Sequence, residues 1–338
     1  MVLTVQSVEK SRLTRSKRVG VSGVHVPCSI GGDSDRTAIL QMHYLSSYPE
    51  LPGARDRFIV DLRGPRPQHD PWRYQGLSVE DELTERGDLA RVGTVFLTGR
   101  ECPWRCAMCD LWRSTTQSDT PAGAIPAQLR TAWSVWRDAG EMITRVKLYN
   151  ASNFFDPRAV PEADYAALAE ELVDVEQVIV ESHPSLVGAR VERFRASLAG
   201  PSLEVAMGLE TAHPAALEAL NKRMTTGDFE RAAALLRDRS VSVRVFLLIH
   251  PPFIPADAQD EWLLRSVSFA IACGASVISL VPTRGGNGAM EALARQGLFR
   301  APTSADIARS VDLVRSQITN DGSGAVRILL DPWAADAR

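Results

Sequence analysis

The stretch that decides the fold is residues 94–109, TVFLTGRECPWRCAMC. It opens with a short run of apolar and β-branched residues, Thr94–Leu97, which is typical of a buried strand. A four-residue turn follows, and three cysteines come next, Cys102, Cys106 and Cys109. The sequence therefore predicts a strand whose carboxyl end leads directly into a loop rich in thiols.

Beyond this stretch, short apolar runs alternate with longer helical patterns almost to the end of the chain. Runs without strict polar–apolar alternation indicate parallel strands that are covered on both faces. The further expected strands are Arg145–Tyr149, Gln177–Val180, Leu203–Met207, Val243–Ile249, Ser276–Val281 and Val326–Leu330. The expected helices are Ile125–Ala139, Glu162–Val173, Pro214–Asn221, Asp228–Asp238, Asp260–Cys273 and Thr303–Gln317.

This order of strands and helices predicts an α/β protein built from parallel βα units. Six or seven such units make either an incomplete barrel or a doubly wound sheet, and we expect a partial (βα)6 barrel of the TIM type. In both architectures the functional site lies at the carboxyl ends of the strands.

Residues 1–90 differ from the remainder, because turn formers and charges dominate and periodicity is scarce. We expect an N-terminal extension over residues 1–90 that is partly ordered and packs on a barrel of residues 91–338. The alternative for residues 1–30 is a disordered leader.

Composition narrows the classes of function. The chain has 338 residues, of which 45% are hydrophobic and 23% are charged, as in ordinary globular proteins. Its formal net charge of −3 argues against a protein that binds polyanions by charge alone. No run approaches the roughly 18 apolar residues of a membrane span, and no apolar run of signal-peptide type follows the first basic residues. We therefore expect a cytoplasmic protein.

The cysteines indicate a metal centre rather than disulfides. There are five, an odd number, and three of them lie within eight residues, whereas disulfide scaffolds use paired, dispersed cysteines. The spacing C-x3-C-x2-C lets one short loop bind three corners of a cubane cluster and leaves the fourth iron open. The alternatives are a zinc site, which usually has four ligands and paired CxxC spacing, or a set of buried cysteines. Cys28 and Cys273 are not assigned to the cluster.

The segment TGRECPWRCAMCDLW, residues 98–112, resembles the cluster loop of the radical S-adenosylmethionine (SAM) superfamily. The resemblance implies that the three cysteines hold a [4Fe-4S] cluster whose open iron binds the amino and carboxyl groups of SAM. Reductive cleavage of SAM then gives methionine and a 5′-deoxyadenosyl radical, which abstracts hydrogen from a substrate. One departure is Met108, where the family usually has an aromatic residue before the third cysteine. A methionine can pack over the cluster or the adenine in its place.

The resemblance extends to motifs of lower specificity at the ends of later strands. Asn150, Ser152 and Asn153 stand where the family has a Gly-Gly-Glu segment that contacts the SAM amino group, although an Asn/Ser-rich turn is the alternative. Gly208 and Glu210 resemble the segment that reaches the ribose or methionine part of SAM, although Glu210 also suits the start of a helix.

Other strand ends are expected to face the cofactor or the substrate. Glu181 and Ser182 would point into the mouth of the barrel, and His183 is either a substrate contact or a capping residue. His250 ends a strand that packs on adenine in the superfamily. Thr283 begins a loop that would complete the adenine site or hold an anionic group, with a flexible turn as the alternative.

Two segments, MGLETAHPAALEALNKRMT and RVFLLIHPPF, resemble radical SAM proteins grouped with archaeosine biosynthesis and the elongator catalytic subunit, which act on tRNA. No RNA-binding module or basic stripe is evident, so the acidic balance favours a small biosynthetic substrate over a tRNA base. A reductant such as flavodoxin or ferredoxin is implied. The rivals from other classes are a non-catalytic iron–sulfur carrier or sensor, which needs a fourth cluster ligand, and a zinc-bound scaffold or RNA-binding protein.

Overall fold

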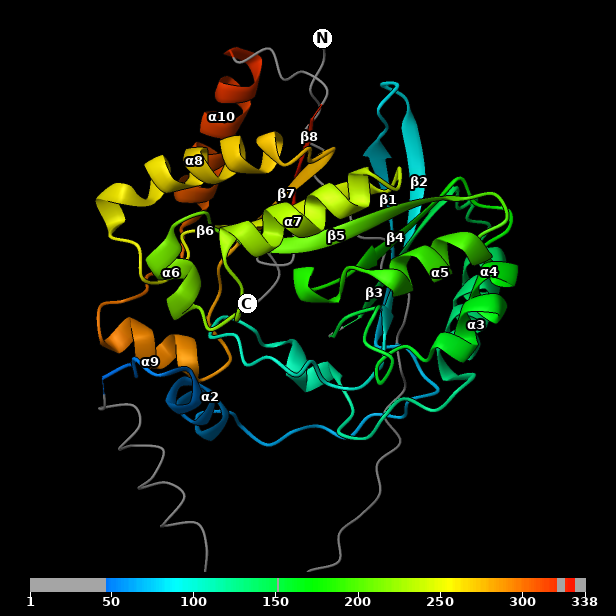
Figure 1. Ribbon diagram of the computed structural model, residues 1–338, viewed down its shortest axis with the longest axis horizontal. Helices are drawn as coiled ribbons and strands as arrows, with labels where there is room; N and C mark the ends of the chain where they lie inside the picture. Colours follow the sequence, from blue (N-terminus) through cyan, green and yellow to red (C-terminus); the bar gives the residue numbers. More distant parts are fainter. Residues whose placement is uncertain (1–46, 151, 321–325, 332–338) are drawn as a thin grey trace, which may run out of the picture.

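The computed structural model describes residues 47–150, 152–320 and 326–331, and its strands form one curved sheet with helices on the outer face (Figure 1). The strands are β1 (Gly76–Leu83), β2 (Leu89–Leu97), β3 (Arg145–Asn150), β4 (Gln177–Glu181), β5 (Ser202–Glu210), β6 (Ser242–Ile249), β7 (Val277–Pro282) and β8 (Arg327–Leu330). The α-helices are α2 (Pro52–Asp61), α3 (Ala124–Asp138), α4 (Tyr165–Glu171), α5 (Ala189–Ser197), α6 (Pro214–Ala219), α7 (Thr226–Arg237), α8 (Gln259–Ala272), α9 (Ala289–Arg295) and α10 (Ser304–Asn320).

The sheet is a nearly closed barrel. Its strands follow one another in sequence order, β1 antiparallel to β2 and all later neighbours parallel. The two edge strands approach each other, since the guanidinium of Arg327 on β8 donates to the carbonyl of Leu83 on β1 at 3.0 Å. Consecutive order, without the reversal of a doubly wound sheet, confirms the expected partial barrel of the TIM type.

Every expected strand and helix is present, with small shifts at its ends. The helix expected from Glu162 begins as a 3-10 turn, Glu162–Asp164, and continues as α4. Among the α-helices and strands of the described residues, four were not anticipated: α2, β1, α5 and α9. The boundary expected at residue 90 falls inside β2, while Cys28 and the first part of the expected extension lie outside the described residues.

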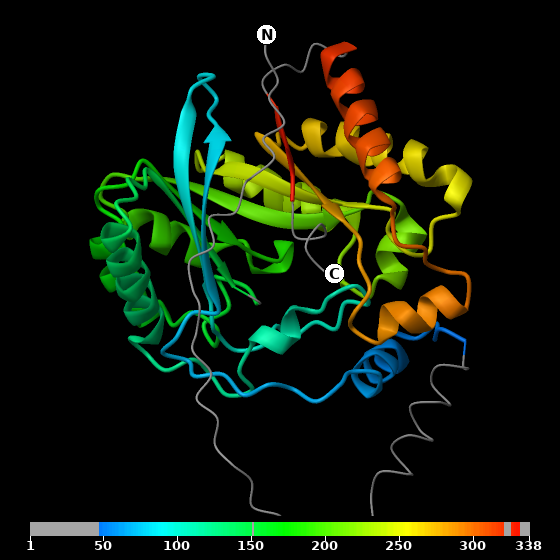
Figure 2. The same cartoon turned by 180° about the vertical axis from the view of Figure 1, so that it is seen from behind.

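The main hydrophobic core lies between the outer face of the sheet and the helices. Helix α3 shows how the sequence builds it, because Ile125, Leu129, Ala132 and Trp136 recur at the spacing of one helical face and are buried. On the sheet side, alternate residues of each strand face outward, as Val146 does on β3. This layer holds the strands in register, so their carboxyl ends meet at one end of the barrel. Figure 2 shows the same arrangement from behind.

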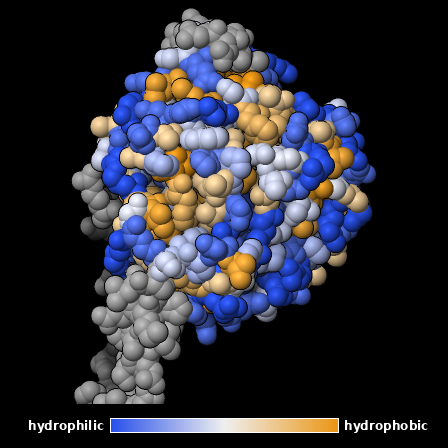
Figure 3. Space-filling view, turned by 60° about the vertical axis from the view of Figure 1, so that its left-hand side comes forward, coloured by the Kyte–Doolittle hydropathy of each residue, from blue (hydrophilic) through white to orange (hydrophobic). Residues whose placement is uncertain are grey.

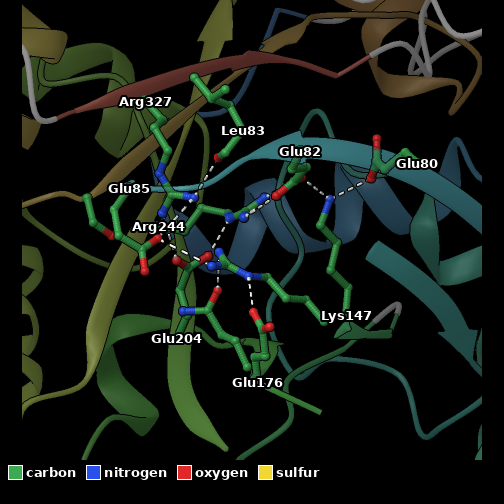
Figure 4. A network of polar contacts seen from close by, with 12 residues as sticks. Glu80, Glu82, Leu83, Glu85, Lys147, Glu176, Glu204, Arg244 and Arg327 are labelled. Carbon is green, nitrogen blue, oxygen red and sulfur yellow. Dashed lines mark hydrogen bonds and ion pairs between the residues drawn. The ribbon is translucent and has the colours of Figure 1, made fainter. Parts of the chain in front are cut away.

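The inside of the barrel near the amino ends of the strands is filled by ionised side chains (Figure 4). The guanidinium of Arg244 lies 2.9 Å from the Glu82 carboxylate and 2.6 Å from that of Glu204. Lys147 pairs with Glu82 as well, and with Glu80 at 2.6 Å. Burial would raise the pKa of Glu82, but Arg244 and Lys147 hold that pKa well below its usual range. Charges thus occupy the space that apolar residues fill in most such barrels.

A second, smaller core supports the cysteine loop. Helices α2 and α9 lie side by side in both views (Figure 1; Figure 2), and Phe58, Ile59 and Leu62 pack against Met290 of α9. Ala107, which lies between two of the cysteines, is buried in the same cluster. Residues before the barrel and residues after β7 therefore hold the loop from one side.

Gly288 lets these two helices approach, and its replacement by alanine is expected to push them apart. Its φ is +87°, and a Cβ there would lie 2.0 Å from the carbonyl oxygen of Leu62. We expect Gly288→Ala to lower the free energy of unfolding by about 2 kcal/mol, measured by urea denaturation. Gly297→Ala is the matched control, because Gly297 has a φ of +72° with nothing within 4 Å. Equal losses in the two variants would contradict the role given to the Leu62 contact.

The surface mixes residue types. On the face shown in Figure 3, hydrophobic residues lie in small groups among hydrophilic ones. Of the large exposed hydrophobic residues, Leu51, Trp72 and Met142 come from separate segments. None of the helices in residues 47–320 as described is long and apolar enough to span a membrane.

Candidate functional site

The cysteine loop crosses the mouth of the barrel directly after β2. Cys102, Cys106 and Cys109 are free and partly exposed, in contrast to Cys273, which is buried at the end of α8. The loop folds back on itself, since the Cys109 amide donates to the Cys106 carbonyl at 3.2 Å and the Arg105 guanidinium to the Cys102 carbonyl at 2.6 Å. Three sulfurs therefore lie on one short, internally braced segment.

Three asparagine side chains from other parts of the barrel donate to this loop. The Asn221 amide donates to the Arg105 carbonyl at 2.7 Å. The Asn287 amide donates to the carbonyls of Ala107 at 2.7 Å and Cys109 at 3.3 Å. The third, Asn153, donates to the Cys102 sulfur itself at 3.3 Å. Loops after β3, α6 and β7 thus fix the position of the cysteines.

The front of the loop is braced by the segment after α2. Glu101 accepts from Arg63 at 2.7 Å and from Arg66, and Arg105 lies 3.3 Å from the same carboxylate. The guanidiniums of Arg63 and Arg66 also lie over the ring of Trp112. These contacts tie the residues on both sides of the three cysteines to the chain that precedes the barrel.

Burial raises the pKa of all three thiols, to about 12 for Cys109. The neighbouring cysteines act in the same direction for Cys106 and Cys109, so the sulfurs lie within electrostatic reach of one another. Lys222 acts in the opposite direction on Cys102 and Cys106. Bare thiols in this loop are therefore protonated at neutral pH, and a metal centre is what would hold them as thiolates.

The donor set fits an iron–sulfur cluster. Thiolates are its usual ligands, and three on one loop leave one iron of a cubane without a protein ligand. No group of three His, Cys, Asp or Glu side chains among the described residues has the geometry to hold a single metal ion. Cubane ligands bind separate irons, so they do not have to converge on one point.

A buried ion pair lies beside the cysteines. Glu210, at the end of β5, accepts from the ammonium of Lys222, and each side chain is 10% exposed. Burial would lower the pKa of Lys222, but the Glu210 carboxylate raises it, so the lysine stays charged. Glu210 has a φ of +67° at an irregularity in the β5–β6 pairing. Gly208 leaves the space for the pair, because a Cβ there would lie 2.2 Å from the Lys222 nitrogen.

The loop after β3 brings one of its expected residues to the cysteines. Asn153 contacts the Cys102 sulfur, as described above. The Ser152 hydroxyl is buried without a hydrogen-bond partner, which leaves it available to a ligand. The side chain of Asn150, at the end of β3, is not described.

The end of β4 packs against the cysteine loop through His183. Its imidazole stacks on the ring of Trp104, with centroids 3.9 Å apart and planes at 11°. His183 Nε2 lies 2.9 Å from the Lys222 carbonyl, which can only accept, so this nitrogen carries the proton. Burial lowers the pKa of His183 to about 3, and the neutral ring serves as a packing surface. Ser182 is buried and donates to the His183 carbonyl, whereas Glu181 is partly exposed.

The ends of β6 and β7 contribute differently. His250, just after β6, has a φ of +55°. Burial lowers the pKa of its imidazole. The charged side chains that also act on this pKa belong to α8, to α10 and to the residues just before α10. The Nε2 of His250 and the hydroxyl of Thr283 are buried without hydrogen-bond partners. Arg284 pairs at 2.8 Å with Asp110, the residue after the third cysteine. The structure thus ties the β7 loop to the cysteine loop through Arg284 and Asn287.

Sequence reasoning missed Lys222 and Asn221 as members of this site, and it placed Asn287 only in a loop expected to face cofactor or substrate, not against the cysteine loop. Each contacts a residue far away in the sequence or on another element, so spacing along the chain gave no signal. Asn221 and Arg223, in the loop between α6 and α7, have positive φ values, as has Glu210 at the end of β5, and residues in this conformation cluster at functional sites. Trp104 belongs to the cysteine motif, but nothing in the sequence indicated that its ring stacks on His183.

Fold and site together define an α/β barrel whose mouth carries a braced three-cysteine loop beside a buried lysine–glutamate pair. No protein-family model matches the chain. The chain is 29% identical to archaeosine synthase subunit beta of Methanosarcina acetivorans over 219 residues, which cover 62% of each protein. The aligned region is therefore well short of that relative's full length. The sequence relative confirms the resemblance to the archaeosine-biosynthesis group that the motifs indicated.

Two solved structures resemble parts of this chain. One is Elp3 of Methanocaldococcus infernus, lacking its N-terminus, with a TM-score of 0.48 at 13% identity. The superposition covers 60% of this chain and 51% of the Elp3 chain. The other is coproporphyrinogen III oxidase of Escherichia coli, a radical SAM enzyme, with a TM-score of 0.45 at 14% identity. The superposition covers 68% of this chain and 52% of the oxidase chain.

Proposed function

We propose that this protein is a radical SAM enzyme. Cys102, Cys106 and Cys109 would hold a [4Fe-4S] cluster, and SAM would bind its open iron. When bound, this pair of cofactors supplies reductive cleavage of SAM to methionine and a 5′-deoxyadenosyl radical that abstracts hydrogen from the substrate. The observation that carries the proposal is the set of three free thiols on one braced loop at the barrel mouth.

The surrounding residues supply charge and orientation. The ammonium of Lys222, buried beside the thiols, complements a carboxylate at the methionine end of SAM. Glu210 keeps that lysine charged and can accept from a hydroxyl or an ammonium. The unpaired Ser152 hydroxyl and the loop carbonyls after β3 are candidates for the SAM amino group. Trp104, stacked on His183, would form an aromatic surface beside the same region.

The direct test is anaerobic. Protein supplied with iron, sulfide, SAM and dithionite is expected to form 5′-deoxyadenosine and methionine, followed by liquid chromatography and mass spectrometry. A non-catalytic carrier or sensor would reduce and reoxidise its cluster without consuming SAM. A zinc scaffold would take up zinc and show no iron–sulfur absorption. Either result would overturn the proposal.

Lys222 is expected to control SAM affinity. We expect Lys222→Met to weaken SAM binding to the cluster-loaded protein by about tenfold to a hundredfold, because a buried charge-assisted contact is lost. Equilibrium dialysis with labelled SAM measures the effect. Arg223→Met is the matched control, since the neighbouring Arg223 is 36% exposed and pairs with Asp56. If the two variants bind SAM equally well, Lys222 has no such role.

For the substrate, the acidic balance of the chain supports a small biosynthetic molecule. A modified tRNA base is the second candidate. It is supported by the relative named archaeosine synthase subunit beta. Filter binding with total tRNA separates the two. Binding that weakens steeply with salt, together with 5′-deoxyadenosine formation stimulated by tRNA, would favour the second candidate.

We further infer that the protein acts in the cytoplasm with a low-potential reductant such as flavodoxin or ferredoxin. Free thiols on the cysteine loop suit a reducing compartment. The expected result is that reduced flavodoxin replaces dithionite in the assay for 5′-deoxyadenosine.

A further inference from the structure

Asn153 differs from the other asparagines of the site because its side chain joins a cysteine sulfur to the peptide backbone. Its amide nitrogen lies 3.3 Å from the Cys102 sulfur, and its carbonyl oxygen lies 2.5 Å from the backbone nitrogen of His183. The side chain is buried, with 5% of the residue exposed. Both ends of one short amide are therefore engaged, away from solvent.

The contact with His183 fixes which way this amide points. A backbone N–H can only donate, so the group of Asn153 that faces it must be the oxygen. The NH2 group of the same amide must then face Cys102. This orientation follows from the His183 contact alone and does not depend on the contact with the sulfur. His183 is itself anchored, through its ring nitrogen, to the Lys222 carbonyl and, through its ring face, to Trp104. The donor is thus preorganised before any cluster is bound.

We propose that Asn153 is a positioning residue that raises the reduction potential of the cluster through an N–H···S hydrogen bond to Cys102. This inference rests on the proposed function. The couple concerned is the one-electron reduction of the [4Fe-4S] centre, with the electron supplied by an external reductant. Reduction adds negative charge to the cluster and its sulfur ligands. A donor aimed at a ligating sulfur stabilises the reduced form more than the oxidised form, and so raises the potential.

The other two asparagines provide the contrast. Asn221 and Asn287 donate to carbonyl oxygens of the loop and not to sulfur. They hold the loop in place, but they do not face the charge that reduction adds. If Asn153 were merely structural, its removal would resemble theirs. If it acts on the sulfur, only its removal changes the potential.

The experiment compares the variants Asn153→Ala and Asn287→Ala, which are both neutral and remove one side-chain amide each. Each protein is reconstituted anaerobically and titrated with dithionite without SAM, and the reduced cluster is followed by electron paramagnetic resonance. The expected result is a midpoint potential more negative than wild type for Asn153→Ala and unchanged for Asn287→Ala. Asn153→Gln, which keeps an amide donor, is expected to restore part of the potential. If Asn153→Ala does not retain its cluster, the nearly isosteric Asn153→Leu, which also lacks a donor, takes its place in the comparison.

A wild-type midpoint potential in Asn153→Ala would overturn the inference, even if that variant lost stability or cleaved SAM slowly. Equal shifts in the two alanine variants would overturn it as well, since the effect would then come from loosening of the loop. Failure of the proposed function has a different signature, because the wild-type protein would then assemble no cluster or leave SAM intact.

Discussion

Replacing Cys106 with alanine is expected to abolish both cluster assembly and the formation of 5′-deoxyadenosine. Two thiolates from one loop cannot hold the three corners that a cubane with one open iron requires. Cys106 is the central residue of the motif, and its neighbours Arg105 and Ala107 are both bound by the rest of the barrel. The loop therefore has no freedom to bring another ligand into its place. Iron and sulfide content, the visible absorption spectrum and product formation measure the loss.

Cys273→Ala is the matched control. Cys273 is also a free cysteine, but it is buried where α8 ends, and burial raises the pKa of its thiol to about 11. This variant is expected to keep the wild-type iron content and activity. A Cys106→Ala protein that still carried a full cluster and cleaved SAM would contradict the assignment of the ligands.

The second large effect is expected at the other end of the barrel. Arg244→Met removes the cation that two buried carboxylates share, Glu82 and Glu204, which are 5% and 0% exposed. Breaking a buried ion pair from one side leaves uncompensated charge and costs about 3–5 kcal/mol. We therefore expect a loss of that order in the free energy of unfolding, measured by urea denaturation followed by circular dichroism. Removing Glu82 as well, with Glu82→Gln, is expected to recover part of the loss.

The control is an arginine on the rim of the same sheet. Arg91 on β2 pairs with Asp81 at 3.2 Å and with Glu141 at 2.7 Å, but its side chain is 36% exposed. Arg91→Met is expected to cost about 1 kcal/mol or less, as exposed pairs do. If both variants lose the same stability, the charges inside the barrel do not stabilise it in the way described.

These ionised residues also explain which parts of the fold the sequence could predict. The outer faces of the strands follow ordinary rules, so apolar runs located all seven parallel strands. Strand β1 was missed because its inward side chains include Glu80 and Glu82, and its pattern looks like that of an exposed segment. A glutamate becomes an interior residue only when Lys147 and Arg244 face it, and those partners come from distant strands.

Helices α5 and α9 were missed for a related reason. Helix α5 is strongly polar, with only Val191 and Phe194 buried, so its apolar stripe is narrow. Helix α9 is short, and it depends on Gly288 and on packing against α2. In both cases tertiary contacts, rather than a long periodic pattern, decide the local structure.

The candidate site likewise has one part that the sequence could predict and one part that depends on tertiary contacts. The three cysteines are local in sequence, and the spacing alone pointed to the loop. The residues around them converge from the ends of several strands, so their partners were not visible, as with Lys222 and Asn287. Asn153 was singled out for SAM, whereas the structure directs its amide at Cys102. The roles given to Gly208, Glu210 and the remaining strand-end residues stay predictions.

The central claim is that three sulfur ligands leave one iron open to SAM. Electron paramagnetic resonance of the anaerobically reconstituted, dithionite-reduced protein tests it directly when spectra with and without SAM are compared. The account predicts iron and sulfide in the ratio of a [4Fe-4S] cluster and a clear change in the signal when SAM is added. A complete cluster whose signal is unaffected by saturating SAM would contradict it, because every iron would then already be bound by the protein.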